Sequence, residues 1–168
     1  SDILSKWVGE AERNIAANAK LSNHEKELAR ERARLAEQSK QSMNTLGDGL
    51  LTQEPLRHHT TFRIGGAAEY FFAARTPDDL VAALAAANEL GLPVFVLGGG
   101  SNLLISDEGL PGLVIHDACE RVEWDGQAAY VEGGADFTAF IERCAERGLA
   151  GLEVMAGIPG SVGGALYG

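Results

Sequence analysis

Residues 93–103 read Pro93-Val94-Phe95-Val96-Leu97-Gly98-Gly99-Gly100-Ser101-Asn102-Leu103, an unbroken apolar run followed by three glycines. Such a run, bounded by a turn signal, is typical of a buried strand. The glycines allow positive φ angles and let a ligand approach the main chain closely. Consecutive N–H groups in such a turn can bind phosphate oxygens, and Ser101 and Asn102 add side-chain donors. For this loop taken alone, a plain tight turn is an equally good interpretation.

A strand and a helix are predicted directly before this run. Glu69–Ala74 is a compact aromatic and apolar stretch, which predicts the strand. Thr76 can cap a helix, Pro77 suits its first position, and Asp79 lies where the helix dipole favours an acid. Gly91 then ends the helix. Between these two ends, apolar side chains recur at helical spacing: Leu80, Ala83, Leu84 and Ala87.

Two more strands, a helix and a second glycine loop are predicted after the triple glycine. Leu113–Ile115 and Ala128–Val131 are short apolar runs typical of strands. Asp136 precedes an amphipathic helix that Gly148 ends. One face of this helix carries Phe137, Phe140, Ile141 and Cys144. Gly157–Ala165 is too rich in glycine to form a helix or a strand, so we predict a loop there.

The second glycine loop favours a dinucleotide ligand over two unrelated turns. Gly157-Ile158-Pro159-Gly160-Ser161-Val162-Gly163-Gly164 offers bare backbone that Pro159 stiffens. Two such loops in one small domain suit an extended dinucleotide, with one loop at the pyrophosphate and the other near the ring. Neither loop is a GxGxxG followed by a helix and an acid, so a Rossmann site is not indicated.

Composition excludes several classes of function. The formal net charge of −10 argues against a nucleic-acid binder or a binder of anionic membranes. The longest apolar runs are too short to span a membrane, and the first residues do not form a signal peptide. Cys119 and Cys144 form no CxxC pair and no metal-ligand cluster with the histidines, so no metal site is predicted. We expect two ordinary buried thiols in a reducing cytosol, and hence a cytoplasmic protein.

The chain changes composition near Met43, which predicts a helical appendage, 1–42, and a domain, 43–168. Every lysine lies before Met43, and every glycine except Gly9 lies after it. The appendage is rich in good helix formers, and a helix is predicted to start at Ser22. Its leucines recur every seven residues but are too few to predict a coiled coil: Leu21, Leu28 and Leu35. A segment of separate origin that mediates self-association is one interpretation.

Three blocks of sequence carry a specific family resemblance. They are Thr60–Phe71 (TTFRIGGAAEYF), Leu92–Gly109 (LPVFVLGGGSNLLISDEG) and Gly151–Ala165 (GLEVMAGIPGSVGGA). In order and spacing they resemble the MurB family of UDP-N-acetylenolpyruvoylglucosamine reductases. The resemblance covers about residues 50–168, and Met43 is a candidate for the natural start.

The resemblance implies a fold, a cofactor and a reaction. The fold would be α+β, a vanillyl-alcohol-oxidase/MurB-type FAD-binding domain that is incomplete here. In the family, NADPH supplies a hydride that FAD passes to the enolpyruvyl group of a nucleotide sugar, for peptidoglycan synthesis. The resemblance assigns FAD binding to two sets of residues: Leu97, Gly98, Gly99, Gly100, Ser101, Asn102 and Leu103, and Gly157, Ile158, Pro159, Gly160, Ser161, Gly163 and Gly164.

The resemblance stops before the family's catalytic residues. No position here matches the family's catalytic arginine, proton-donating serine or glutamate, so no catalytic residue is named. We expect the chain to be inactive alone and to bind a nucleotide sugar only if the substrate domain is supplied. Glu153 is predicted to be a structural carboxylate, and His58 and His59 surface histidines, whereas Arg63 meets either a phosphate or an acid. The alternative is a non-catalytic chimeric or vestigial flavin-fold protein that associates through its helical N-terminus.

Overall fold

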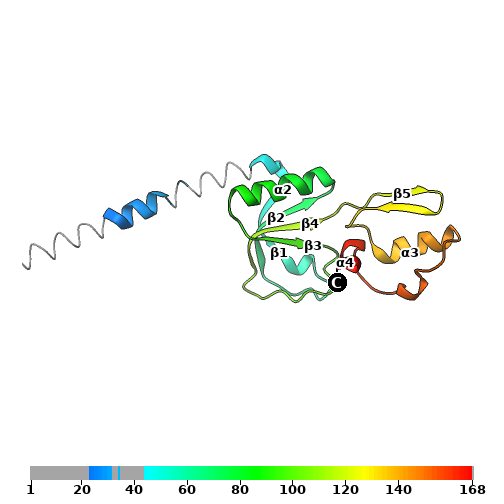
Figure 1. The fold of residues 1–168 in the computed structure, drawn as a ribbon. Coiled ribbons are helices and arrows are strands. Elements are labelled where there is room, and N and C mark those ends of the chain that lie inside the picture. The colour runs from blue at the N-terminus through cyan, green and yellow to red at the C-terminus, as the bar shows by residue number, and fades with distance from the viewer. Residues whose placement is uncertain (1–22, 32–33, 35–43, 168) are drawn as a thin grey trace, which may run out of the picture. The chain divides into compact units, whose positions relative to one another are not determined.

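The computed structural model describes residues 23–31, 34 and 44–167, and it divides the chain into two units, Ser1–Gln41 and Ser42–Gly168 (Figure 1). In the first unit, residues 23–31 form a helix with exposed side chains. The predicted helix start and two of the three spaced leucines lie outside the described residues. The assignment of 1–42 and 43–168 as separate domains stays a prediction. Among the described helices, none combines the length and apolar character that a membrane crossing requires.

The second unit is built on a four-stranded mixed sheet of order β1-β2-β4-β3 (Figure 1). Strand β1 pairs antiparallel with β2, whereas β2, β4 and β3 run parallel. The predicted strand, helix and strand are present, but β4 lies between the two strands that the helix connects. The elements of this part are η1 (Asn44–Gly49), β1 (Leu50–Pro55), η2 (Leu56–His58), β2 (Ala67–Ala74), α2 (Pro77–Glu89), β3 (Val94–Leu97) and β4 (Leu110–Asp117).

Helix α2 begins as its sequence predicts. The Thr76 side chain accepts a hydrogen bond from the Asp79 N–H at 3.2 Å, and the Asp79 carboxylate accepts one from the Thr76 N–H at 2.9 Å. This reciprocal capping box satisfies two donors that have no partner within the helix. At the other end, Gly91 has a φ of 62°, so the residue after the cap turns the chain out of the helix.

The sheet carries a core on each face because its strands alternate. Leu113 and Ile115 face α2, whereas Val114 between them faces the other side. The core under α2 contains Leu46, Phe72, Ala74, Ala83, Ala87, Leu113 and Ile115. The core on the opposite face contains Leu56, Ala68, Phe71, Leu97, Ile105 and Val114.

The prediction that β3 is a buried strand is wrong. β3 lies at the edge of the sheet, where Val94 is 39% and Val96 is 54% exposed. Phe95 and Leu97 pack into the core on the opposite face, so only one side of the strand is covered. An unbroken apolar run predicts burial on both faces, but α2 contributes its core residues against β2 and β4 rather than β3.

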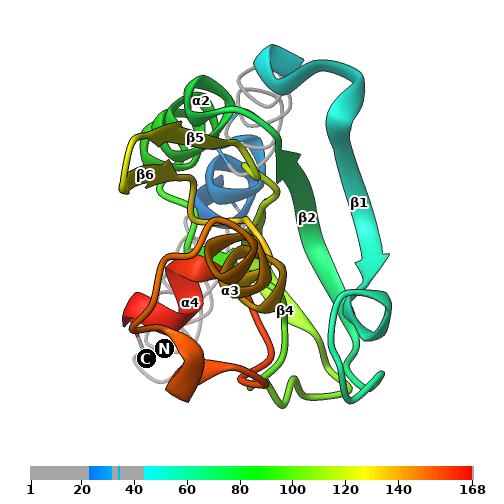
Figure 2. The same ribbon diagram turned by 90° about the vertical axis from the view of Figure 1, so that its right-hand side faces the viewer.

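A second layer of elements follows β4. The hairpin of β5 (Val122–Asp125) and β6 (Ala128–Val131) lies beside helices α3 (Phe137–Glu146) and α4 (Val162–Tyr167), with η3 (Glu153–Met155) between the helices in sequence (Figure 2). Strand β6 and helix α3, which Asp136 caps, agree with the sequence prediction. Strands β1 and β5 were not predicted. The core of this layer contains Ala135, Phe137, Ile141 and Val162.

The prediction of a loop through Gly157–Ala165 is wrong at its end, because helix α4 starts at Val162. The Ser161 hydroxyl accepts the Gly164 N–H at 3.3 Å, and the Ser161 carbonyl accepts the Ala165 N–H at 2.9 Å. The Gly163 N–H donates to the Gly133 carbonyl at 2.8 Å, and a Cβ atom on Gly163 would lie 3.0 Å from that oxygen. Gly163 therefore serves close backbone packing and not a turn.

Candidate functional site

The two glycine loops contact each other directly. The Ser101 hydroxyl donates to the Pro159 carbonyl at 2.9 Å, across 58 positions of sequence. A Cβ atom on Gly99 would lie 3.1 Å from the Gly160 Cα, and one on Gly98 would lie 2.5 Å from the Ser161 Oγ. Any side chain at Gly98 or Gly99 would push the loops apart. Residues 98–101 and 159–161 can therefore meet because these two positions carry no side chain.

Both loops present backbone N–H groups that have no protein partner. In the part of the chain that the structure describes, no hydrogen bond is formed by the N–H groups of Gly99, Gly100, Ser101 or Asn102. Gly100 is buried, and an unpaired buried N–H is unfavourable unless a ligand or a water accepts from it. The N–H of the buried Ser161 is also without a protein acceptor within the described residues. Successive N–H donors of this kind form an anion-binding nest.

Each loop is held from outside by a different segment. Gly100 has a φ of 62°, and a Cβ atom there would overlap the carbonyl oxygen of His59. The Thr61 N–H donates to the Gly100 carbonyl at 3.0 Å, so the connection between β1 and β2 supports the first loop. The second loop is anchored at the start of α3, where the Phe137 N–H donates to the Gly160 carbonyl at 2.9 Å.

Two histidines lie at the same end of the sheet as the first loop. The His59 ring stacks on Phe71 with centroids 4.3 Å apart, and its Nε2 lies 3.0 Å from the Glu54 Oε1. His116 pairs in register with Leu97, and its ring lies 5.8 Å from that of His59. Burial, and then the nearby His59, lower the pKa of His116. The surface prediction is correct for His58, whose side chain is 59% exposed, but wrong for the half-buried His59 at 22%.

The other predicted FAD-binding residues differ in their surroundings. Leu97 is fully buried in the sheet core, and Leu103 packs beside it. Asn102 and Gly157 are exposed. Ile158 is exposed as well, and Gly163 and Gly164 lie in α4 rather than in the loop. The structure thus brings together residues 98–101 of the first predicted set and residues 159–161 of the second.

Two charged residues from the sequence prediction are exposed. Glu153 accepts hydrogen bonds from its own backbone N–H and from that of Gly151, which lower its pKa and agree with a structural carboxylate. Arg63 takes part in none of the ion pairs among the described residues. Its φ of 55° is unusual for a residue with a side chain.

A third glycine pair, Gly133-Gly134, was overlooked although it is visible in the sequence. A Cβ atom on Gly134 would lie 2.5 Å from the Asp117 carbonyl oxygen, and one on Gly133 would lie 2.7 Å from the Asp117 Oδ2. The pair therefore lets the second layer approach the end of β4. Gly133 also carries the carbonyl that holds Gly163, so it supports the element after the second loop.

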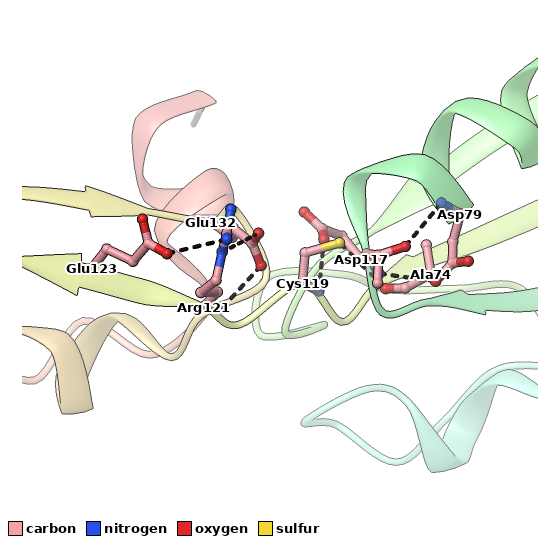
Figure 3. Close-up of polar contacts among 8 residues, drawn as sticks. Ala74, Asp79, Asp117, Cys119, Arg121, Glu123 and Glu132 are labelled. Atoms are coloured by element: carbon pink, nitrogen blue, oxygen red, sulfur yellow. Dashed lines mark hydrogen bonds and ion pairs between the residues drawn. The ribbon is translucent and has the colours of Figure 1, made fainter.

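An ion-pair network lies where the chain passes from β4 to the hairpin (Figure 3). The buried Glu132 carboxylate accepts from the Arg121 backbone N–H at 3.0 Å and from its Nε at 3.2 Å. The Arg121 Nη1 lies 3.1 Å from the Glu123 Oε1. Cys119 is buried beside this network, with its Sγ 3.6 Å from the Ala74 carbonyl. Among residues 23–31, 34 and 44–167, no group of His, Cys, Asp or Glu could hold a metal ion.

Comparison with known proteins identifies the family to which the domain belongs. A family model described as FAD binding domain matches residues 68–168. The UDP-N-acetylenolpyruvoylglucosamine reductase of Acaryochloris marina is 50% identical over 110 residues, which are 64% of this chain and 36% of the relative. That of Geobacter sulfurreducens is 46% identical over 124 residues, 70% of this chain and 40% of the relative.

A solved structure agrees with these relatives. The crystal structure of UDP-N-acetylenolpyruvylglucosamine reductase (MurB) from Thermus caldophilus has a TM-score of 0.56 and 36% identity, covering 70% of this chain and 40% of that one. The chain therefore belongs to the FAD binding domain family. Its domain is of the MurB type, as the sequence blocks predicted, and it spans about 40% of the length of the reductases that it matches.

Proposed function

We propose that this chain binds FAD at the junction of its two glycine loops. The observation that carries the proposal is the contact between the loops, where Ser101 is bonded to Pro159 and the N–H groups of Gly99 to Asn102 have no protein acceptor. Two phosphate groups need several donors in a row, and a nest of backbone N–H groups provides them. These donors do not depend on the chain's acidic net charge of −10.

The two loops would hold different parts of the cofactor. The N–H groups of Gly99, Gly100, Ser101 and Asn102 would donate to the pyrophosphate, while Gly160 and Ser161, which lie against Gly99 and Gly98, would contact the cofactor from the second loop. Bound FAD would supply hydride transfer, and the role of the protein would be to hold and orient it. The other residues that the sequence assigned to FAD binding stay proposed contacts of the cofactor: Leu97, Gly98, Leu103, Gly157, Ile158, Pro159, Gly163 and Gly164.

We further propose that the chain is the FAD-binding part of an NADPH-dependent reductase of UDP-N-acetylglucosamine enolpyruvate in peptidoglycan synthesis. The support is the identity to reductases of that name in several bacteria. Because the chain spans about 40% of those relatives, binding of NADPH and of the nucleotide sugar is proposed only for the whole reductase. We assign no catalytic residue within the described part, and the cytoplasmic location stays a prediction.

Cofactor retention tests the first proposal. The purified chain is incubated with FAD and desalted, and its absorbance is recorded. We expect a flavin band at close to one FAD per chain, because the donors of the nest are already in place. A control sample incubated with riboflavin, which has no phosphates, should lose its colour on desalting. A colourless protein in the FAD sample would contradict the proposed cofactor site.

Turnover tests the second proposal. Formation of the reduced nucleotide sugar from UDP-N-acetylglucosamine enolpyruvate and NADPH should be undetectable for this chain alone, since no acid that could protonate the carbanion left by hydride transfer is assigned in it. Joining the chain to the remaining part of a relative such as the Geobacter sulfurreducens reductase should restore turnover. Turnover by the chain alone would contradict the expected inactivity, and an inactive hybrid that retains FAD would contradict the proposed reductase role.

A further inference from the structure

His59 and His116 lie beside the first glycine loop, and the proposed backbone nest does not use their side chains. The main chain of His59 touches Gly100, where its carbonyl oxygen occupies the space of a Cβ atom. His116 lies opposite Leu97 in the parallel pairing of β3 and β4, directly before the loop begins at Gly98. The two ring centroids are 5.8 Å apart, and the two residues flank the loop in the backbone, His116 from β4 and His59 from the β1–β2 connection.

The charges around this pair are mostly negative. The Glu54 Oε1 lies 3.0 Å from the His59 Nε2 and 3.9 Å from the Nδ1 of His58. Asp117 and Glu120 are the acids that act on His116, and His59 is the basic group that acts on it. Phe71 covers one face of the His59 ring. Because burial disfavours the charged imidazolium, the pKa of His116 is lowered and the neutral ring is favoured.

We propose that His59 and His116 are phosphate ligands of the dinucleotide site and that His116 takes up a proton when the dinucleotide binds. The proposal rests on the proposed FAD function and adds a charged component to a nest whose other donors are uncharged N–H groups. A pyrophosphate diester keeps two negative charges near neutral pH, and such a neighbour favours the protonated imidazole. The proton comes from the buffer, and no covalent bond forms or breaks.

The physical reason is a linkage between the ligand and the proton. The bound dianion raises the pKa of His116, so the complex holds more protons than the free protein at a pH between the His116 pKa of the free protein and that of the complex. Affinity for FAD should therefore rise as the pH falls through that interval. A charge-assisted hydrogen bond of ordinary strength corresponds to about a tenfold change in the dissociation constant.

Isothermal titration of the full chain with FAD tests this inference. Titrations in two buffers of different ionisation enthalpy should show net proton uptake, and the dissociation constant should fall about tenfold between about pH 8 and pH 6. His116→Gln should abolish the proton uptake, and His59→Gln and His116→Gln should each weaken binding at the lower pH. The matched control is His58→Gln, which removes an adjacent but largely exposed histidine and should retain both effects.

The outcomes separate this inference from the proposed function. FAD binding with no proton uptake and a pH-independent dissociation constant would overturn the histidine assignment and leave the FAD site standing. No FAD binding at any pH would remove both. If one variant loses its native circular dichroism, the other variant and the proton uptake of the unmodified chain still decide the question.

Discussion

The hydroxyl group of Ser101 donates a hydrogen bond of 2.9 Å to the carbonyl oxygen of Pro159, and this bond joins the two glycine loops of the domain. Beside this bond, Gly98 lies against Ser161 and Gly99 against Gly160, and a side chain at either glycine would separate the loops. This side-chain hydrogen bond thus connects the segment after β3 with the segment before α4. The proposed FAD site depends on this contact.

Replacement of Ser101 tests that dependence. Ser101→Ala removes the bond to Pro159 and should lower the free energy of unfolding by about 1 kcal/mol. It should also weaken FAD binding several-fold, because the second loop is no longer tied to the first. Ser106→Ala is the control, since its hydroxyl also forms a hydrogen bond with the backbone, but it accepts this bond from the nearby Glu108 N–H and, among the described residues, forms none with the second loop. Equal FAD affinity in the two variants would contradict the role of the bond.

Two glycines with the same backbone angle separate strain from packing. Gly100 and Gly126 have φ angles of 62° and 58°, but a Cβ atom would overlap His59 at Gly100 and meet nothing within 4 Å at Gly126. Gly126→Ala should destabilise the protein by about 1 kcal/mol through the backbone angle alone. Gly100→Ala should destabilise it by roughly 3 kcal/mol or more. Urea unfolding measures both, and similar values would show that the first loop can move away from His59.

The cysteines should resist modification in the folded protein. Cys119 is buried, and burial together with the hydrogen bond and charge of Asp117 raises the pKa of its thiol to about 12. The reactive species is the thiolate, so the thiol is unreactive at mildly alkaline pH. Iodoacetamide should modify neither Cys119 nor the buried Cys144 in the native state, and both in urea. Mass spectrometry locates the label, and fast native modification of Cys119 would contradict its burial.

The exposed edge strand β3 should promote self-association. An apolar strand edge with free N–H and C=O groups pairs readily with other chains, and a lysine on such an edge opposes this. Val96→Lys should therefore reduce self-association, which lowers the average molecular mass of the protein in solution as measured by light scattering. Val81→Lys replaces an exposed valine on α2, away from the edge, and should leave the mass unchanged.

Deletion of residues 1–42 tests the alternative that this segment, and not the edge strand β3, causes self-association. If the molecular mass in solution falls on deletion but not with Val96→Lys, residues 1–42 are the associating segment and the edge strand is not. A monomer at every concentration would contradict both expectations. The same measurement thus tests the alternative from the sequence analysis, in which the protein associates through residues 1–42.

Local chemistry was recognisable in the sequence wherever it depends on neighbouring residues. The capping box of Thr76 and Asp79 and the cap at Asp136 are formed within one helical turn. Gly91 and Gly148 take positive φ angles at the helix ends, as their positions predicted. Helices α2 and α3 could therefore be placed without knowledge of the fold. The three blocks of sequence also predicted the family.

Elements whose formation depends on distant partners could not be placed in this way. Strand β1 ends at Pro55 and carries Gln53 with a φ of 55°, so it lacks the pattern of a regular strand and is held by pairing with β2. The short strand β5 alternates apolar and acidic residues and exists through its pairing with β6. Helix α4 includes two glycines, and its first turn is held by Gly133 and Ser161.

By itself the sequence placed helices α2 and α3, strands β2, β3, β4 and β6, and the two glycine-rich runs Gly98–Gly100 and Gly157–Gly164. Only the tertiary structure decided that these runs meet, that β3 lies at an edge, and that His59 and His116 flank the first loop. The physical reason is that a glycine specifies where the main chain can be approached but not which segment approaches it. That choice depends on sheet pairing and core packing between residues far apart in the chain.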